Sequence, residues 1–250
     1  MGIYSLVFAG GAALGPSIGV LLQSSRTLPF FVSAAIGASA GLFLLAVFDN
    51  VVPTKRHALS YTGLLGWIWG PLLSVLCYAL VEVTMLSLFP LYLTHIGLDR
   101  RLVSFLFSVY ASGAVVSPLI AGVISDRFRR ESVMIASAVL LLSGAVFVSF
   151  ASGPAWLAIT IAIMGLAAGA IYPVALSIIG DRTPAPQLGA ANSLFTSAYS
   201  AGSIVGPFAI GSMMDIYGAQ VLFTPLIVVS IAFVVVASAD KNAVKETSLV

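Results

Sequence analysis

Long apolar stretches separated by short polar segments account for most of the chain, and this alternation predicts its elements. A helix needs roughly 20 apolar residues to cross about 30 Å of hydrocarbon. The pattern predicts eight membrane-spanning segments, near residues 3–23, 29–48, 62–93, 102–124, 132–150, 155–179, 190–213 and 221–238. The spans are expected to be helices because unpaired backbone groups are too costly in lipid and no apolar–polar alternation suggests a barrel.

Composition places the chain among multi-spanning membrane proteins. Hydrophobic residues make up 60% of the 250 positions, charged residues only 8%, and the mean hydropathy is +1.09. A soluble domain carries about 25% charged residues. The uncharged run from Ser132 to Gly180 is too long for one helix. The segment 152–154 divides it, because proline and glycine break the helical hydrogen-bond ladder.

Basic residues indicate the orientation of the spans. Eight spans place both termini on the same side, and if that side is the cytoplasm most basic residues lie inside, as the positive-inside rule requires. The inside set is Lys55, Arg56, Arg127, Arg129, Arg130, Arg182, Lys241 and Lys245, and the outside set is Arg26, Arg100 and Arg101. We therefore expect a multi-pass protein of the cell (inner or plasma) membrane with both termini cytoplasmic, and no nucleic-acid partner.

A glycine–proline pattern occurs in both the first and the seventh predicted span. The first contains Gly11, Gly15, Pro16 and Gly19, and the seventh contains Gly202, Gly206, Pro207 and Gly211. The spacing between the two patterns fits an internal repeat of six helices. Small residues let backbones approach closely, while proline bends a helix and frees a carbonyl. The pattern is compatible with a hinge or seal between two halves and with tight packing alone.

Several motifs together resemble the major facilitator superfamily. The first span is similar to the proline-kinked fifth helix of that family, and residues 122–130 are similar to its cytoplasmic loop between the second and third helices of a half. The sixth and seventh spans resemble its tenth and eleventh helices through Gly165, Gly169, Tyr172-Pro173, Asp181-Arg182 and Gly206-Pro207. One departure is Arg129, which stands where the loop motif usually has a glycine.

The resemblance implies an all-α membrane protein whose eight transmembrane helices correspond to helices five to twelve of that family. It assigns residues 1–48 to the last two helices of an N-terminal bundle, 49–61 to a cytoplasmic linker, 62–240 to a six-helix C-terminal bundle and 241–250 to a cytoplasmic tail. The first four helices of the family have no counterpart in this sequence, although they supply half of the central cavity. Another chain is therefore a candidate partner that would supply them.

Glu82 is the only ionisable side chain well inside a predicted span. A charge at the bilayer centre is costly, so it calls for a partner, a proton or a water-filled cavity. Three- and four-residue steps place Ser74, Tyr78, Glu82 and Met85 on one helical face. The resemblance implies that this helix lines the substrate path. Glu82 is thus a candidate for proton coupling or for binding a cationic substrate, and the structural alternative is a protonated side chain that bonds a neighbouring helix.

The sixth span offers a second set of candidate pocket residues. Met164 and Tyr172 fall near one face of that helix, and the resemblance implies that this helix also lines the cavity. A lining rich in methionine and aromatic rings suits varied apolar solutes, because methionine adapts its shape. Packing against neighbouring helices is an equally compatible interpretation.

The end of the fourth span carries a cluster of charges that includes Asp126, Arg127 and Arg130. Their spacing from Gly122 predicts a conformational latch. A charge cluster at a membrane boundary otherwise serves topology, and Asp126 is also a candidate to cap a helix N-terminus, where negative charge is favourable.

The sequence contains no catalytic triad, metal cluster or nucleotide-binding loop, so we expect neither an enzyme nor a cofactor. The leading hypothesis is a secondary active transporter of small solutes that works by alternating access, coupled to protons if Glu82 titrates. The fifth-helix motif favours efflux by antiport, by family analogy alone. Expected partners are a small-molecule substrate, protons and the lipid bilayer. The alternative is a truncated, non-transporting membrane protein or a helical bundle completed by another chain.

Overall fold

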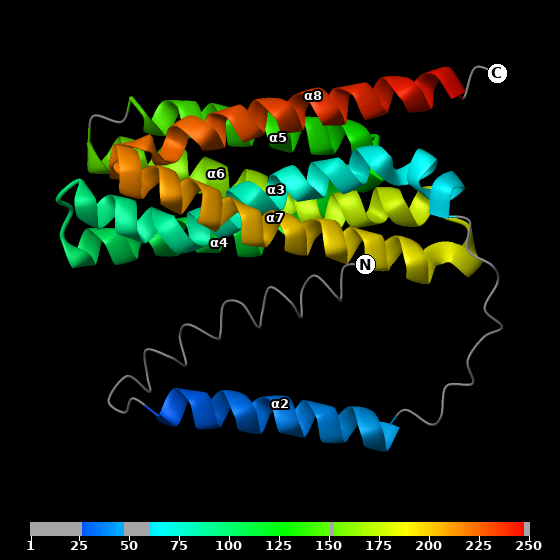
Figure 1. Cartoon of the computed structure of the whole chain (residues 1–250), viewed down its shortest axis with the longest axis horizontal. Coiled ribbons are helices and arrows are strands. Elements are labelled where there is room, and N and C mark those ends of the chain that lie inside the picture. Colours follow the sequence, from blue (N-terminus) through cyan, green and yellow to red (C-terminus); the bar gives the residue numbers. More distant parts are fainter. Residues whose placement is uncertain (1–26, 48–60, 151–152, 248–250) are drawn as a thin grey trace.

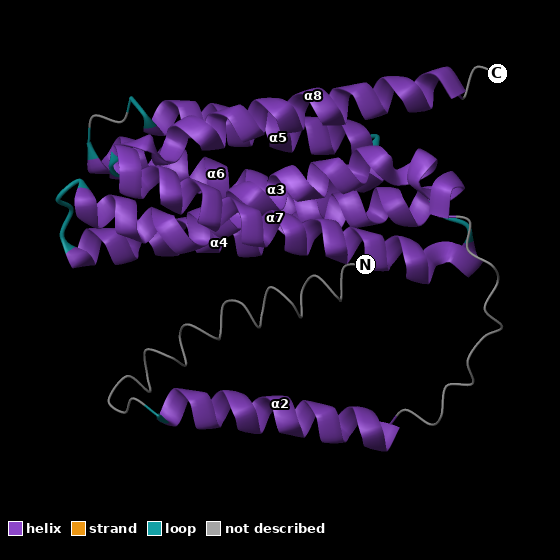
Figure 2. Ribbon diagram, in the orientation of Figure 1, coloured by secondary structure: helices purple, strands orange, loops and turns teal. Residues whose placement is uncertain are grey.

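The structure, a computed structural model, describes residues 27–47, 61–150 and 153–247, and these are almost entirely helical (Figure 2). The helices are α2 (Leu28–Val47), α3 (Tyr61–His95), α4 (Arg100–Arg127), α5 (Arg130–Val148), α6 (Pro154–Arg182), α7 (Leu188–Tyr217) and α8 (Phe223–Thr247). Two short 3-10 turns, η1 (Ala185–Gln187) and η2 (Ala219–Leu222), precede α7 and α8. No strand occurs in the described part of the chain, so the predicted all-α class is confirmed.

Two predicted features fall on residues that the structure does not describe. The first predicted span, with its motif residues Gly11, Gly15, Pro16 and Gly19, lies outside the described residues, as does nearly all of the linker at 49–61. At the other end, α8 continues as helix to Thr247, well into the segment assigned to the tail.

Six stretches of the described chain are long and apolar enough to cross a membrane, which makes this a multi-pass membrane protein. They lie in α2, α3, α4, α5, α6 and residues Ala219–Asp240. Helix α7 has 30 residues but is less apolar, since it is rich in serine, alanine and glycine. Such a composition is tolerated where a helix packs against other helices or lines a cavity. The total of eight spans stays a prediction.

Helices α3 to α8 form one bundle, and α2 lies apart from it (Figure 1). Within the bundle α3 and α6 are central, α5 and α8 cover one side, and α4 and α7 cover the other (Figure 1). The core is filled by large side chains that are almost completely buried, among them Tyr78, Met85, Phe89, Tyr110 and Phe195. The outer side of α7 leaves Ile204 and Phe208 more than 70% exposed, so this side is available to lipid or to further helices.

Two pairs of helices approach closely because glycines lie between them. On α7, Gly206 faces the backbone of α3, where an added Cβ would lie only 2.6 Å from the carbonyl oxygen of Leu80. On α6, an added Cβ at Gly169 would collide with the carbonyl oxygen of Ala114 on α4. Pro118 has no N–H to donate to that same Ala114 carbonyl, which is four residues earlier. Two glycines of the α7 pattern, Gly202 and Gly206, therefore pack closely against α3.

Candidate functional site

A hydrogen bond at Glu82 joins two helices of the bundle. Glu82 lies on α3, and the hydroxyl of Tyr199 on α7 donates to its Oε2 atom at 2.9 Å. Tyr78, one turn earlier on α3 and only 1% exposed, also interacts with this carboxyl. Glu82 itself is partly buried. The structure thus brings together Tyr78 and Glu82 as predicted, and adds Tyr199.

Aromatic rings from α3, α6 and α7 form a connected group beside the carboxyl. The ring centroids of Tyr78 and Tyr199 are 6.4 Å apart. Tyr172 on α6 lies edge-on to Tyr199, with centroids 5.4 Å apart and planes at 90°, and it contacts Phe195 at 5.0 Å. The predicted residue Tyr172 therefore reaches Glu82 through Tyr199.

A fourth tyrosine approaches the site from α4. Tyr110 is 1% exposed and lies close enough to Glu82 to interact with it electrostatically. Its hydroxyl has no hydrogen-bond partner among the residues that the structure describes. Since a buried hydroxyl is normally bonded to protein or water, this oxygen marks a polar spot in an otherwise apolar interior.

Sequence reasoning missed Tyr199 and Tyr110. A usable signal existed for Tyr199, because steps of three and four residues place it on the same face of α7 as Gly202 and Gly206. Both glycines contact α3, so a side chain on that face is expected to point towards α3. No comparable pattern marks Tyr110.

The remaining predicted pocket residues lie in the core of the bundle. Ser74 and Met85 are 0% exposed, and the hydroxyl of Ser74 lacks a hydrogen-bond partner within the described structure. Met164 is also 0% exposed, and its side chain packs directly against Gly144 of α5. This contact supports the packing interpretation of Met164, and its role in a pocket stays a prediction.

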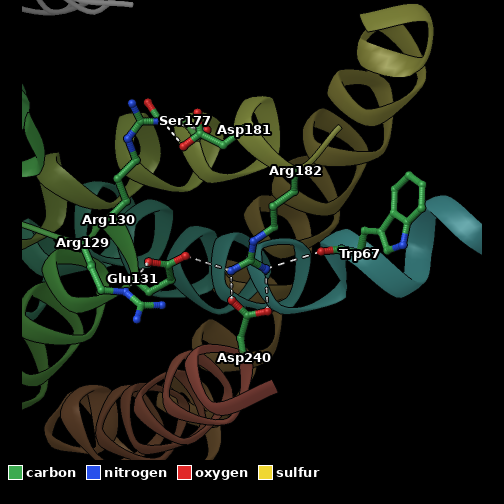
Figure 3. A network of polar contacts seen from close by, with 8 residues as sticks. All are labelled: Trp67, Arg129, Arg130, Glu131, Ser177, Asp181, Arg182 and Asp240. Atoms are coloured by element: carbon green, nitrogen blue, oxygen red, sulfur yellow. Dashed lines mark hydrogen bonds and ion pairs between the residues drawn. The ribbon is translucent and has the colours of Figure 1, made fainter. Parts of the chain in front are cut away.

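A second polar cluster lies near the N-terminal end of α3, where Trp67 is located (Figure 3). The guanidinium of Arg182, at the end of α6, donates two hydrogen bonds of 2.8 Å to the two carboxylate oxygens of Asp240 on α8. It also reaches Glu131 of α5 at 3.3 Å. Bidentate pairs of this kind are stronger and more directional than single contacts, and Asp240 is only 1% exposed.

Proline chemistry on α3 explains one more bond of this cluster. Pro71 has no N–H, so the carbonyl of Trp67, four residues earlier, loses its helical donor. Arg182 donates to this carbonyl at 3.4 Å. One guanidinium therefore ties together α3, α5, α6 and α8, in an arrangement that the sequence analysis did not foresee.

The loop residues predicted to form a latch occupy the same end of the bundle. Arg130 pairs with Asp181 of α6 and donates at 3.2 Å to the carbonyl of Ser177 (Figure 3). Asp126 and Arg127 are exposed and make no ion pair within the described residues. Asp126 does not cap α5, because it lies in the last turn of α4 and the N-cap position of α5 is Arg129.

Gly122 is exposed on α4, and a Cβ added there would meet nothing within 4 Å. It therefore makes no close contact inside the described bundle, unlike Gly206. Within the described residues there is also no group of three or more His, Cys, Asp or Glu side chains arranged to hold a metal ion.

Comparisons with known proteins agree with this architecture. The sequence matches the family model of the Major Facilitator Superfamily over residues 71–247. YfkF of Bacillus subtilis (strain 168), an uncharacterized MFS-type transporter, is 29% identical over 235 residues, covering 89% of this chain and 59% of YfkF. YcaD of Salmonella heidelberg (strain SL476), named in the same way, is 25% identical over 253 residues, covering 96% of this chain and 62% of YcaD.

The fold is also similar to that of the POT family transporter PepTSo in its in meso crystal structure. The TM-score is 0.64 at 18% sequence identity, and the match covers 71% of this chain and 37% of that chain. At this identity the likeness concerns the fold alone. The chain spans about 60% of the length of the curated relatives it matches. Because the family model covers well over half of the sequence, including nearly all of α3 to α8, the chain belongs to the Major Facilitator Superfamily, a family of membrane transporters.

Proposed function

We propose that this chain forms the larger part of a secondary transporter that moves small solutes by alternating access, with proton uptake and release at Glu82. The observation that carries the proposal is the hydrogen bond from Tyr199 to Glu82. It connects α3 to α7 far from either end of both helices. The family supports transport, and this bond is the physical basis for coupling transport to protons.

The protonation state of Glu82 changes the free energy that the hydrogen bond from Tyr199 contributes. An ionised carboxylate accepts hydrogen bonds worth about 1.5–3 kcal/mol, whereas bonds between neutral groups contribute about 0.5–1.5 kcal/mol. Proton uptake would therefore weaken the link from Tyr199 by about 1–1.5 kcal/mol. A change of 1.36 kcal/mol shifts an equilibrium about tenfold, which is enough to alter the balance between two conformations of α3 and α7.

Close packing makes α3 and α7 responsive to such a change. Gly206 brings α7 within contact of the Leu80 carbonyl. The hydroxyl of Thr84, which has no hydrogen-bond partner among the described residues, lies beside the same glycine. Packed helices have discrete rather than continuous arrangements. We propose that Gly206 and Pro207 provide the seam along which α7 moves when Glu82 gains or loses its proton.

The charged end of the bundle supplies the second part of the proposal. Arg182 holds α3, α5, α6 and α8 together, so these helices would move as one unit while the Glu82 site reorganises. Asp126 and Arg127 make no ion pair among the described residues, so they are available to contact a segment outside the described bundle. We propose that they form the cytoplasmic latch with Arg130, at the side where most basic residues lie.

A bundle completed by further helices is the second candidate function. The observation that favours it is the apolar outer side of α7, where Ile204 is 72% and Phe208 is 76% exposed. Further helices could belong to the same protein or to another chain. Co-purification of the tagged chain with a second, membrane-embedded chain would support the latter.

A distance measurement between α3 and α7 tests the proton-coupling proposal. Spin labels at the exposed positions Thr94 and Tyr217, in a Cys77→Ser background, would report the separation of the two helix ends by pulsed electron paramagnetic resonance. The distance distribution should change between acidic and alkaline pH in the wild type. In Glu82→Gln the distribution should match the acidic wild-type distribution at every pH, because glutamine mimics a protonated carboxyl.

The matched control is Glu131→Gln, which removes a carboxylate from the Arg182 cluster and leaves Glu82 intact. It should retain the pH-dependent change. A pH response of the same size in Glu82→Gln would contradict proton coupling at Glu82.

A further inference from the structure

We propose that Glu82, Tyr172 and Tyr199 form a recognition site for a weakly hydrated organic cation, such as a quaternary ammonium or phosphonium ion. The inference deepens the proposed transport function and rests on it. It names the substrate class from the charge and the ring geometry around a single carboxyl.

The charge around Glu82 is unbalanced whenever the carboxyl is ionised. Among the residues that the structure describes, the titratable groups that interact with Glu82 are tyrosines, namely Tyr78 from α3, Tyr110 from α4 and Tyr199 from α7. Tyr172 from α6 packs against Tyr199. No ion pair to Glu82 occurs among the residues that the structure describes. A largely buried charge that has hydrogen bonds but no opposite charge beside it is still costly, so the site favours either a proton or a cationic ligand.

The ring geometry favours an organic cation over a metal ion. Hard cations such as Ca²⁺ take six to eight oxygen ligands, and no suitable cluster of acidic or histidine side chains exists in the described structure. Instead, Tyr172 and Tyr199 stand perpendicular with centroids 5.4 Å apart. Two perpendicular rings form adjacent walls of the kind of aromatic cage that binds quaternary ammonium groups through cation–π contacts.

The residues of this site differ in solvent exposure, which distinguishes a buried floor from more accessible walls. Tyr78 and Tyr110 are each only 1% exposed and form the buried floor. Glu82, Tyr172 and Tyr199 keep part of their surface open. These three residues are therefore the ones that a cation entering from the accessible side would meet first.

A cation and a proton would compete for the same carboxyl. Binding of the cation requires the ionised form of Glu82, so a protonated site must release its proton when the cation enters. Apparent affinity for the cation should consequently fall by up to about tenfold for each unit that the pH is lowered through the titration of Glu82. Exchange of one proton for one cation would couple the two fluxes in opposite directions.

Binding of tetraphenylphosphonium to the purified 250-residue chain in detergent tests the inference. The wild type should bind it saturably, with weaker binding at acidic pH, and should release a proton into weakly buffered solution as it binds. Tetraphenylborate, an anion of the same shape, controls for partitioning into the micelle and should show neither saturable binding nor proton release.

Two sets of variants identify the groups responsible. Glu82→Gln should lose saturable binding of tetraphenylphosphonium. Tyr172→Leu should weaken binding roughly 2- to 30-fold, the range that corresponds to a cation–π contact, while Tyr172→Phe keeps the ring and should bind almost as the wild type does. Thermal unfolding in detergent checks that each variant is folded.

The outcomes separate this inference from the proposed function. If the wild type binds no tetraphenylphosphonium, or if Glu82→Gln binds it equally well, the cation site is wrong, although the pH response of the α3–α7 distance can still hold. Equal binding by Tyr172→Leu and Tyr172→Phe would also overturn the aromatic site. If Tyr172→Leu does not fold, proton release by the wild type on binding tetraphenylphosphonium tests whether the cation binds at Glu82.

Discussion

The hydroxyl of Tyr199 donates a hydrogen bond of 2.9 Å to Oε2 of Glu82, across the seam between α7 and α3. Elsewhere along this interface the two helices pack through Gly202, Gly206 and apolar side chains. A bond in such surroundings is strong because the local dielectric constant is low. A change in the charge of Glu82 therefore alters the strength of the contact between α3 and α7.

Tyr199→Phe removes this bond but keeps the ring and its contacts with Tyr78 and Tyr172. The hydroxyl stabilises the ionised carboxylate, so its loss should favour the protonated form. We expect the midpoint of the pH-dependent α3–α7 distance change to move to higher pH by about one unit, which corresponds to about 1.4 kcal/mol. Pulsed electron paramagnetic resonance across a pH series measures it. An unchanged or lower midpoint would contradict the role of Tyr199.

Arg182→Gln should destabilise the bundle strongly. The substitution leaves Asp240, only 1% exposed, without its bidentate partner. Breaking a buried ion pair from one side costs about 3–5 kcal/mol. Thermal unfolding in detergent should show a clear loss of stability.

Arg130→Gln is the matched control for that experiment. Its partner Asp181 has a side chain that is 60% exposed, so the pair is open to solvent. Exposed pairs contribute about 0–1 kcal/mol, and this variant should unfold close to the wild-type temperature. Equal losses in both variants would show that the Arg182 cluster has no special structural role.

Gly206→Ala should push α7 away from α3. A Cβ at this position would lie 2.6 Å from the Leu80 carbonyl oxygen, whereas at Gly211 the nearest atom is Leu88 Cδ1 at 3.8 Å. Overpacking of this kind costs about 1–3 kcal/mol. We expect Gly206→Ala to lower the unfolding temperature and Gly211→Ala to leave it nearly unchanged. A stable Gly206→Ala variant would argue against a tight seam.

Topology is tested by labelling single cysteines in a Cys77→Ser background. Arg129 lies beside the Arg182 cluster, and Arg101 lies in the first turn of α4 at the other end of the bundle. The distribution of basic residues predicts that Arg129→Cys is reached only from the cytoplasm and Arg101→Cys only from outside. A membrane-impermeant maleimide applied to intact cells distinguishes the two. Labelling of Arg129→Cys from outside would reverse the orientation.

The sequence predicted the helical class and most element positions because apolar runs of span length leave few alternatives in a membrane. Glu82 and Tyr78 could be identified for the same reason, since a carboxyl inside an apolar span stands out. Tyr172 was placed on the correct helix, although its link to Glu82 runs through Tyr199.

Long-range partners were beyond the reach of pattern alone. Asp240 follows the last apolar stretch and looked like the end of a span, yet its partner Arg182 lies 58 positions earlier. The bond from Arg182 to the Trp67 carbonyl depends on Pro71. The sequence shows that Pro71 leaves this carbonyl without its helical donor, but it does not show which group replaces that donor. Only the packing of α3, α5, α6 and α8 brings these groups together.

The central claim is that Glu82 takes up and releases a proton in step with the arrangement of α3 and α7. Infrared difference spectroscopy of the purified chain between acidic and alkaline pH measures the carbonyl band of protonated carboxyls directly. We predict a band that appears on acidification in the wild type, disappears in Glu82→Gln, persists in Glu131→Gln and shares its midpoint with the α3–α7 distance change. A full-intensity band in Glu82→Gln, or a midpoint unrelated to the distance change, would contradict the account.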